Sequence, residues 1–220
     1  MILFPRPCLC LVTDRRRAAP EARTDAAALQ ALHRQLDEAM GAGLDLIQIR
    51  ERDLEAAALR AFVRDVVARA PSATRVLVND RADVALAAGT AGVHVRSDGP
   101  AASRVRSIGP AAWFVGRSVH TVEECAAAGD ADYVIFGTVF PSASKPQGSA
   151  IAGVAGLHAA CAAAAVPVLA IGGVTPAGGP ACRDAGAAGL AAIGAFLPSP
   201  ARAILAMRAA WNETDPKLLE

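Results

Sequence analysis

The sequence predicts an α/β protein with a single-domain (β/α)8 barrel, and three observations support this fold. Short β-branched runs alternate with Ala-rich helical stretches along all 220 residues. Several runs, such as Val166–Ile171, are apolar on both faces, which is typical of parallel strands that helices cover. Eight strands and eight helices leave about 27 residues for each βα unit, near the lower end for such a barrel.

The strands are predicted from the short β-branched and apolar runs. In chain order they are Cys8–Thr13, Leu44–Ile49, Arg75–Asn79, Gly92–Val95, Trp113–Ser118, Tyr133–Gly137, Val166–Ile171 and Gly189–Ile193. The rival architecture, a doubly wound open sheet, usually has a glycine-rich turn after its first strand. Here Thr13-Asp14-Arg15-Arg16-Arg17 follows that strand, which favours the barrel.

The helices are predicted from the Ala-rich stretches between the strands. The first begins at the capping pair Thr24-Asp25, and the second ends at Pro71. In chain order they are Thr24–Ala42, Leu54–Ala70, Ala82–Ala88, Ala101–Ile108, Val122–Ala128, Val154–Ala165, Pro180–Ala185 and Ser199–Trp211. No linker divides them, so we expect one domain over residues 1–220, with its core at about 8–211 and a polar tail at 212–220.

Composition excludes several classes of partner. The net charge is +1 and charged residues make up 20% of the chain, which gives no electrostatic case for nucleic acid or an acidic membrane surface. The longest apolar tract, Ala159–Ile171, is broken by Pro167 and is too short to span a bilayer. The five cysteines have no CxxC spacing, so we expect reduced core residues in a cytoplasmic protein. Homo-oligomerisation is left open.

Polar side chains stand at the predicted carboxyl ends of most strands, where a parallel barrel builds its active site. The candidate substrate-binding residues are Gln48, Arg50, Arg52, Asn79, Arg96, Ser118, Ser142 and Ser144. His120 follows the fifth strand and is a candidate for proton transfer, because histidine titrates near neutral pH. His94 lies inside a strand and is expected to be a hydrogen-bonded barrel residue.

Two further features point to an anionic ligand. Gly172-Gly173 and Gly194-Ala195 follow the last two strands, where these barrels usually bind phosphate through backbone N–H groups. Lys145 lies in a loop rich in hydroxyls, Pro and Gly, and it is one of only two lysines among 22 basic residues. A lysine retained in such a chain suggests a need for a point charge, so Lys145 is a candidate catalytic residue.

An ordered set of motifs resembles the thiamine-phosphate synthase/TenI family of (β/α)8 barrels, over about Cys8 to Phe196. The motifs are Cys10-Leu11-Val12-Thr13-Asp14, Gln48-Ile49-Arg50-Glu51-Arg52-Asp53, Val78-Asn79-Asp80-Arg81, Gly92-Val93-His94-Val95, Gly116-Arg117-Ser118-Val119-His120, Ala131–Gly137, the Ser142–Lys145 loop and Ala170-Ile171-Gly172-Gly173-Val174. The resemblance implies that a thiazole phosphate binds to Gly172, Gly173, Gly194 and Ala195. It also implies that Gln48, Arg50 and Arg52 face a pyrimidine or its diphosphate.

The resemblance implies two activities. The synthase joins hydroxymethylpyrimidine diphosphate to the thiazole phosphate and releases diphosphate, with Mg²⁺ held by an Asp after Asn, here Asp80, and by a second Asp. The tautomerase aromatises a thiazole carboxylate phosphate without a metal, and His120 would carry the proton. At the position of the second Asp this sequence has Gly99, although Asp98 is adjacent, and Arg96 could supply a fixed positive charge.

These departures make the TenI-like tautomerase, with no cofactor, the favoured interpretation. The alternative is a synthase that uses Mg²⁺. A second alternative is a regulator that binds thiazole or thiamine phosphates without turnover.

Overall fold

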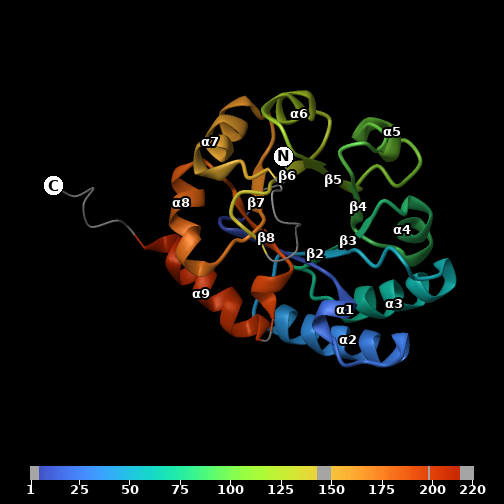
Figure 1. The fold of residues 1–220 in the computed structure, drawn as a ribbon. Helices are drawn as coiled ribbons and strands as arrows, with labels where there is room; N and C mark the ends of the chain where they lie inside the picture. The colour runs from blue at the N-terminus through green and yellow to red at the C-terminus, as the bar shows by residue number, and fades with distance from the viewer. Residues whose placement is uncertain (1–4, 143–149, 198, 214–220) are drawn as a thin grey trace.

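The computed structural model describes residues 5–142, 150–197 and 199–213, and these residues form a closed barrel of eight parallel strands (Figure 1). The strands pair in chain order, and the barrel closes where Cys8 of the first strand pairs with Gly189 of the last. Helices surround the barrel on the outside (Figure 1). The predicted (β/α)8 barrel is therefore confirmed.

All eight predicted strands are present, with ends within two residues of those predicted. They are β1 (Cys8–Val12), β2 (Leu46–Ile49), β3 (Arg75–Asn79), β4 (Gly92–Val95), β5 (Phe114–Val119), β6 (Tyr133–Phe136), β7 (Val168–Ile171) and β8 (Gly189–Ala192). The largest differences are at the starts of β2 and β7, where Leu44 and Val166 lie outside the sheet.

All eight predicted helices are present as well. They are α2 (Asp25–Gly41), α3 (Ala56–Arg69), α4 (Ala82–Ala88), α5 (Ala102–Arg106), α6 (Val122–Ala127), α7 (Gly153–Ala163), α8 (Gly179–Asp184) and α9 (Pro200–Asn212). Three short helices were not predicted: α1 (Arg15–Ala18) and the 3₁₀ turns η1 (Pro176–Gly178) and η2 (Gly194–Phe196). Each is too short to show a helical repeat of apolar residues. No helix of the described residues has the length and apolarity needed to cross a bilayer.

The alternation of side chains along the strands builds two cores. Cys8 and Cys10 point into the barrel, where they pack with Tyr133 and other interior residues, whereas Leu9 and Leu11 face the helices. Burial raises the pKa of the Cys10 thiol to about 12, so this sulfur stays protonated and unreactive at neutral pH. The five cysteines are all free, as expected.

Candidate active site

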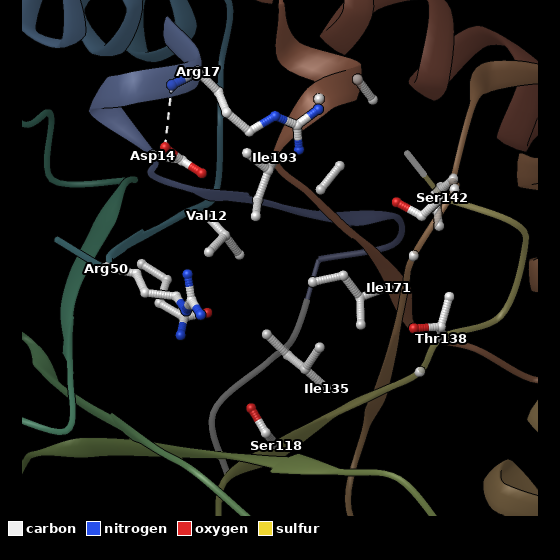
Figure 2. Close-up of a pocket in the computed structure, with 18 of the residues that line it drawn as sticks. Val12, Asp14, Arg17, Arg50, Ser118, Ile135, Thr138, Ser142, Ile171 and Ile193 are labelled. Atoms are coloured by element: carbon white, nitrogen blue, oxygen red, sulfur yellow. Dashed lines mark hydrogen bonds between the residues drawn. The ribbon is translucent and has the colours of Figure 1, made fainter. Parts of the chain in front are cut away.

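A cavity of about 750 Å³ opens at the carboxyl ends of the strands (Figure 2). Twelve of the residues singled out from the sequence line it: Gln48, Arg50, Arg52, Asn79, Arg96, Ser118, His120, Ser142, Gly172, Gly173, Gly194 and Ala195. Asp80 and Asp98 do not line it. Ser144 and Lys145 lie outside the described residues. The barrel therefore brings these residues, which are far apart in the sequence, together in one cavity.

The middle of the cavity is apolar. Val12, Ile135, Ile171 and Ile193 lie between Arg50 on one side and Thr138 and Ser142 on the other (Figure 2). An apolar floor of this kind suits the flat face of an aromatic ring, and the polar groups around it fix the orientation of the ligand. The four side chains come from β1, β6, β7 and the end of β8.

Three arginines, Arg50, Arg52 and Arg96, line one part of the cavity wall, and we call them the arginine side. Burial, followed by the neighbouring charge of Arg52, lowers the pKa of Arg50, although the group stays cationic at neutral pH. Neither Arg50 nor Arg52 forms an ion pair with any residue among 5–142, 150–197 and 199–213. Unpaired guanidinium groups in a partly desolvated wall favour an anionic ligand.

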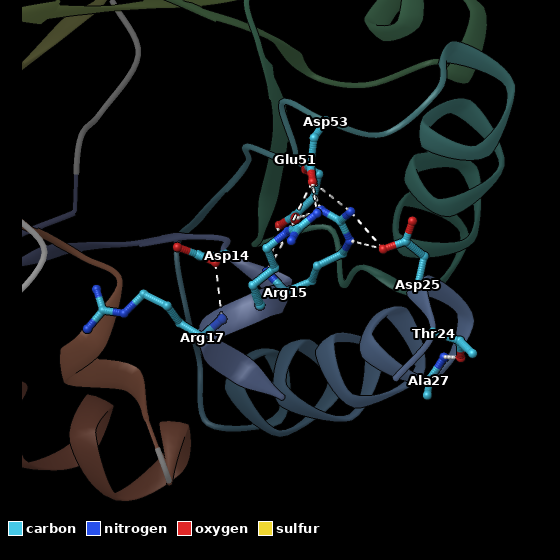
Figure 3. Close-up of polar contacts among 9 residues, drawn as sticks. Asp14, Arg15, Arg17, Thr24, Asp25, Ala27, Glu51 and Asp53 are labelled. Atoms are coloured by element: carbon cyan, nitrogen blue, oxygen red, sulfur yellow. Dashed lines mark hydrogen bonds and ion pairs between the residues drawn. The ribbon is translucent and has the colours of Figure 1, made fainter. Parts of the chain in front are cut away.

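A buried ionic cluster holds the loop that carries Arg50 and Arg52 (Figure 3). Arg15 is 1% exposed, and its guanidinium bonds to Glu51 at 3.1 Å, Asp53 at 2.6 Å and Asp25 at 2.8 Å. The Arg15 amide also donates to both Glu51 carboxylate oxygens at 3.2 Å. The hydrogen bond from Arg15 lowers the pKa of Asp53 well below its usual range. The loops after β1 and β2 are therefore joined through one guanidinium.

The acidic residues next to the cavity do not present a magnesium site. Asp80 and Asp98 both pair with Arg96, whose Nε lies 3.0 Å from Asp80 Oδ2 and 3.3 Å from Asp98 Oδ1. Gly99, at the position where the resemblance implies a second Asp, has no side chain that could add a ligand. Within the described part of the chain, no group of three His, Cys, Asp or Glu residues could hold a metal. The two carboxylates converge, but on a guanidinium, so the residues present do not fit the implied Mg²⁺.

Ser118 is joined to a buried histidine. The His94 Nε2 atom lies 2.9 Å from Ser118 Oγ, and its Nδ1 lies 3.0 Å from the Tyr133 hydroxyl. Burial lowers the pKa of His94 to about 3, so the ring is neutral at neutral pH. A neutral imidazole donates one hydrogen bond and accepts one, so the ring fixes the Ser118 hydroxyl at the cavity wall. His94 is the hydrogen-bonded barrel residue that its strand position predicts.

His120 has one ring nitrogen directed to the backbone and one left for a ligand. Its Nδ1 lies 2.8 Å from the Gly137 carbonyl oxygen, which can only accept a hydrogen bond. Nδ1 therefore carries the proton, and the neutral ring has its lone pair on Nε2. His120 is exposed and lines the cavity, so Nε2 is available as a proton acceptor.

Gly172, Gly173, Gly194 and Ala195 follow β7 and β8, and we call them the glycine side. The amides of Gly173, Gly194 and Ala195 donate no backbone hydrogen bond to the described residues, so they remain available to an anion. The neighbouring chain supplies a reason of its own for glycine at 172 and 173. Both have positive φ, and an added Cβ would overlap Thr138 or the backbone at Pro141. Glycine is therefore needed at both positions because other parts of the chain lie so close, whether or not a ligand binds.

Arg17 is a cavity residue that was missed in the sequence. It belongs to α1, and its side chain extends toward β8 and η2 (Figure 2). An added Cβ on Gly194 would lie 3.0 Å from Arg17 Nη2, so the guanidinium lies directly beside the open amides of the glycine side. Its place just after β1 was a usable signal, but the abundance of arginine made single arginines uninformative.

Comparison with known proteins finds one family over most of the chain. The TMP-TENI family, described as thiamine monophosphate synthase, matches residues 9–196. A putative thiamine-phosphate synthase from Geobacter sulfurreducens is 35% identical over 207 residues, covering 90% of this chain and 93% of that protein. A thiamine-phosphate synthase from Anaeromyxobacter dehalogenans is 40% identical over 178 residues, covering 79% and 80%. These names favour the synthase alternative over the tautomerase interpretation.

Solved structures agree. A thiamine phosphate pyrophosphorylase from Pyrococcus furiosus superposes with a TM-score of 0.71 at 26% identity, covering 92% of this chain and 94% of that chain. A 3-hexulose-6-phosphate synthase superposes with a TM-score of 0.64 at 22% identity, covering 92% and 98%, and this likeness concerns the fold alone.

Proposed function

Because the chain belongs to the thiamine monophosphate synthase family, we propose that it is a thiamine-phosphate synthase. It joins hydroxymethylpyrimidine diphosphate to a thiazole phosphate and releases diphosphate. The observation that supports this proposal is that two sets of hydrogen-bond donors suited to anions, the arginine side and the glycine side, line one cavity with an apolar floor. A reaction between two phosphorylated heterocycles needs both regions at once.

The glycine side holds the thiazole phosphate. The open amides of Gly173, Gly194 and Ala195 donate to the phosphate oxygens, and the adjacent guanidinium of Arg17 neutralises the phosphate charge. The diphosphate of the other substrate binds at the arginine side. The two rings then meet over the apolar floor, which is lined by Ile135 and Ile171 and limits the access of water to the reacting carbon.

The reaction replaces one bond with another. The bond between the pyrimidine methylene carbon and the diphosphate oxygen breaks, and the electron pair leaves with diphosphate. The thiazole nitrogen donates its lone pair to the same carbon, and the new C–N bond gives thiamine phosphate. The guanidinium groups of Arg50 and Arg52 stabilise the charge that develops on the leaving group. Ser118, fixed by His94, donates or accepts a hydrogen bond at the cavity wall.

One observation favours a second candidate, the thiazole tautomerase. His120 has a ring nitrogen, Nε2, available at the cavity, as a group that moves a proton on the thiazole would require. That reaction needs only the thiazole carboxylate phosphate, so no diphosphate substrate would occupy the arginine side. For this reason the synthase is the better account of the whole cavity.

The two candidates are separated by their products. We expect the purified protein to convert the two synthase substrates into thiamine phosphate, detected as fluorescent thiochrome, with one diphosphate released for each molecule formed. Reactions that lack either substrate are the controls. Absence of thiamine phosphate, with or without Mg²⁺, would reject the synthase. Aromatisation of the thiazole carboxylate phosphate that His120→Asn abolishes would then support the tautomerase.

A further inference from the structure

At the ends of β3 and β4, the side chain that lines the cavity wall is a cation, Arg96, and not a carboxylate. Arg96 lines the cavity, whereas Asp80 and Asp98, which pair with it, do not. Neither carboxylate is therefore directed at a ligand in the cavity. The ligand meets a guanidinium that two carboxylates hold in place.

Both carboxylate oxygens of Asp80 are engaged with Arg96 or Asn79. Its Oδ1 accepts from the Arg96 amide at 3.1 Å, and its Oδ2 accepts from Asn79 Nδ2 at 2.9 Å and contacts Arg96 Nε at 3.0 Å. Asp80 also has a φ of 60°, a left-handed conformation that non-glycine residues adopt only where their surroundings hold them in it. Both oxygens of the carboxylate that would bind a metal are thus already used by the protein.

The loop that carries Arg96 is held from the next strand. Arg117 of β5 donates to the carbonyl oxygens of Ser97 at 2.6 Å, Pro100 at 2.9 Å and Gly99 at 3.3 Å. The Arg96 side chain is therefore positioned before any ligand binds, which reduces the entropy lost on binding. Its Nη1 and Nη2 atoms make no hydrogen bond to the described residues, so their N–H groups are free to bind a ligand.

Arg96 acts together with Arg50 and Arg52. All three line the same cavity, Arg52 lies close enough for its charge to act on Arg50, and Asp80, which pairs with Arg96, also acts on Arg50. A guanidinium binds two phosphate oxygens through parallel hydrogen bonds, and it keeps its charge at any physiological pH. Three of them match a diphosphate group in both charge and number of donors.

We propose that Arg96 takes the place of a divalent cation, so that Arg50, Arg52 and Arg96 bind the diphosphate group directly and without Mg²⁺. This inference rests on the proposed function for the identity of the substrate. The binding of inorganic diphosphate tests it independently of turnover.

The first experiment is calorimetric titration of the wild-type protein with inorganic diphosphate in EDTA. We expect binding in EDTA that Mg²⁺ does not tighten. Arg96→Gln should weaken this binding by about tenfold or more, because a charge-assisted hydrogen bond to the diphosphate is lost. Arg104→Gln is the matched control, since this exposed arginine of α5 lies outside the cavity, and it should leave the affinity unchanged.

The second experiment uses Mn²⁺ as a paramagnetic probe for Mg²⁺. We expect the electron paramagnetic resonance spectrum to show no Mn²⁺ bound to the wild-type protein, with or without diphosphate. Binding of diphosphate only with Mg²⁺, or Mn²⁺ bound together with diphosphate, would overturn the inference. The inference would also be overturned if the Arg96→Gln variant bound diphosphate as tightly as the wild type.

Turnover separates this inference from the proposed function. If thiamine phosphate forms equally in EDTA and in Mg²⁺, both stand. If it forms only with Mg²⁺, the synthase stands and the role of Arg96 is refuted. If no thiamine phosphate forms under either condition, the synthase is refuted, and the two binding experiments still decide whether Arg96 replaces the metal.

Discussion

The glycine side of the cavity offers backbone N–H groups, whereas the arginine side offers side-chain guanidinium groups. The backbone donors lie at the ends of β7 and β8, so the fold itself fixes their positions. The guanidinium groups have long side chains: that of Arg96 is held by ion pairs with Asp80 and Asp98, and the loop that carries Arg50 and Arg52 is held by the Arg15 cluster. The backbone topology therefore positions the donors of the glycine side, whereas a network of ion pairs positions those of the arginine side.

The largest expected effect comes from removing the cation that anchors the arginine side. Arg15→Met should lower the free energy of unfolding by about 3–5 kcal/mol, because it leaves Glu51 buried without its partner. Urea denaturation measures this loss. Arg16→Met is the matched control on the same helix, and its exposed ion pair with Asp53 should contribute no more than about 1 kcal/mol. Equal small losses in both variants would mean that the cluster does not anchor the loop.

The second-largest effect is expected on kcat, and it tests whether the arginine side stabilises the diphosphate leaving group. Arg50→Ala should lower kcat for thiamine phosphate formation about 100-fold, as is typical when one group that stabilises developing charge is removed. Arg60→Ala, an exposed position on α3 outside the cavity, is the control and should be unaffected. Steady-state kinetics in both substrates make the measurement. A change in KM alone would show that Arg50 binds the ground state without acting on the leaving group.

The third effect is a dependence of stability on pH that the buried ring of His94 predicts. Its pKa is about 3 in the folded protein and 6.5 when unperturbed, so the unfolded chain binds the proton more tightly. The stability contributed by the neutral ring is present above pH 6.5 and is lost as the pH falls toward 3. The slope should approach about 1.4 kcal/mol for each pH unit. Urea denaturation between pH 4 and 6 should show a shallower slope in His94→Asn, and parallel slopes would contradict the assignment.

The smallest effect concerns the glycine side. Arg17→Ala should raise KM for the thiazole phosphate about tenfold and leave kcat unchanged, since the backbone donors remain. With the thiazole alcohol, which has no phosphate, the variant and the wild type should behave alike. Arg16→Ala is the control, because its side chain is directed to Asp53 instead. An equal loss with the alcohol would show that Arg17 does not contact the phosphate.

The difference between the two sides also explains what could be predicted from the sequence. Alternating apolar runs predicted the barrel, and the strand ends predicted the glycine side, because both follow from backbone topology. That Arg96 lies between Asp80 and Asp98 was not predictable, since it depends on side-chain directions that residue spacing does not fix. Arg17 was missed because arginine is so abundant in this chain that a single arginine after the first strand was uninformative. That Gly173 lies against the backbone of Pro141 was not predictable either, because Pro141 belongs to another loop.

The Arg15 cluster restricts how this barrel can be altered. Barrel enzymes are commonly redesigned by exchanging one βα loop at a time, on the assumption that each loop is an independent module. Here the loops after β1 and β2 and the start of α2 share a single buried guanidinium. A transplanted β2 loop would need its own equivalents of Glu51 and Asp53, or it would leave the buried charge of Arg15 without these partners. Loop exchange in this protein should therefore treat the first two βα units as one piece.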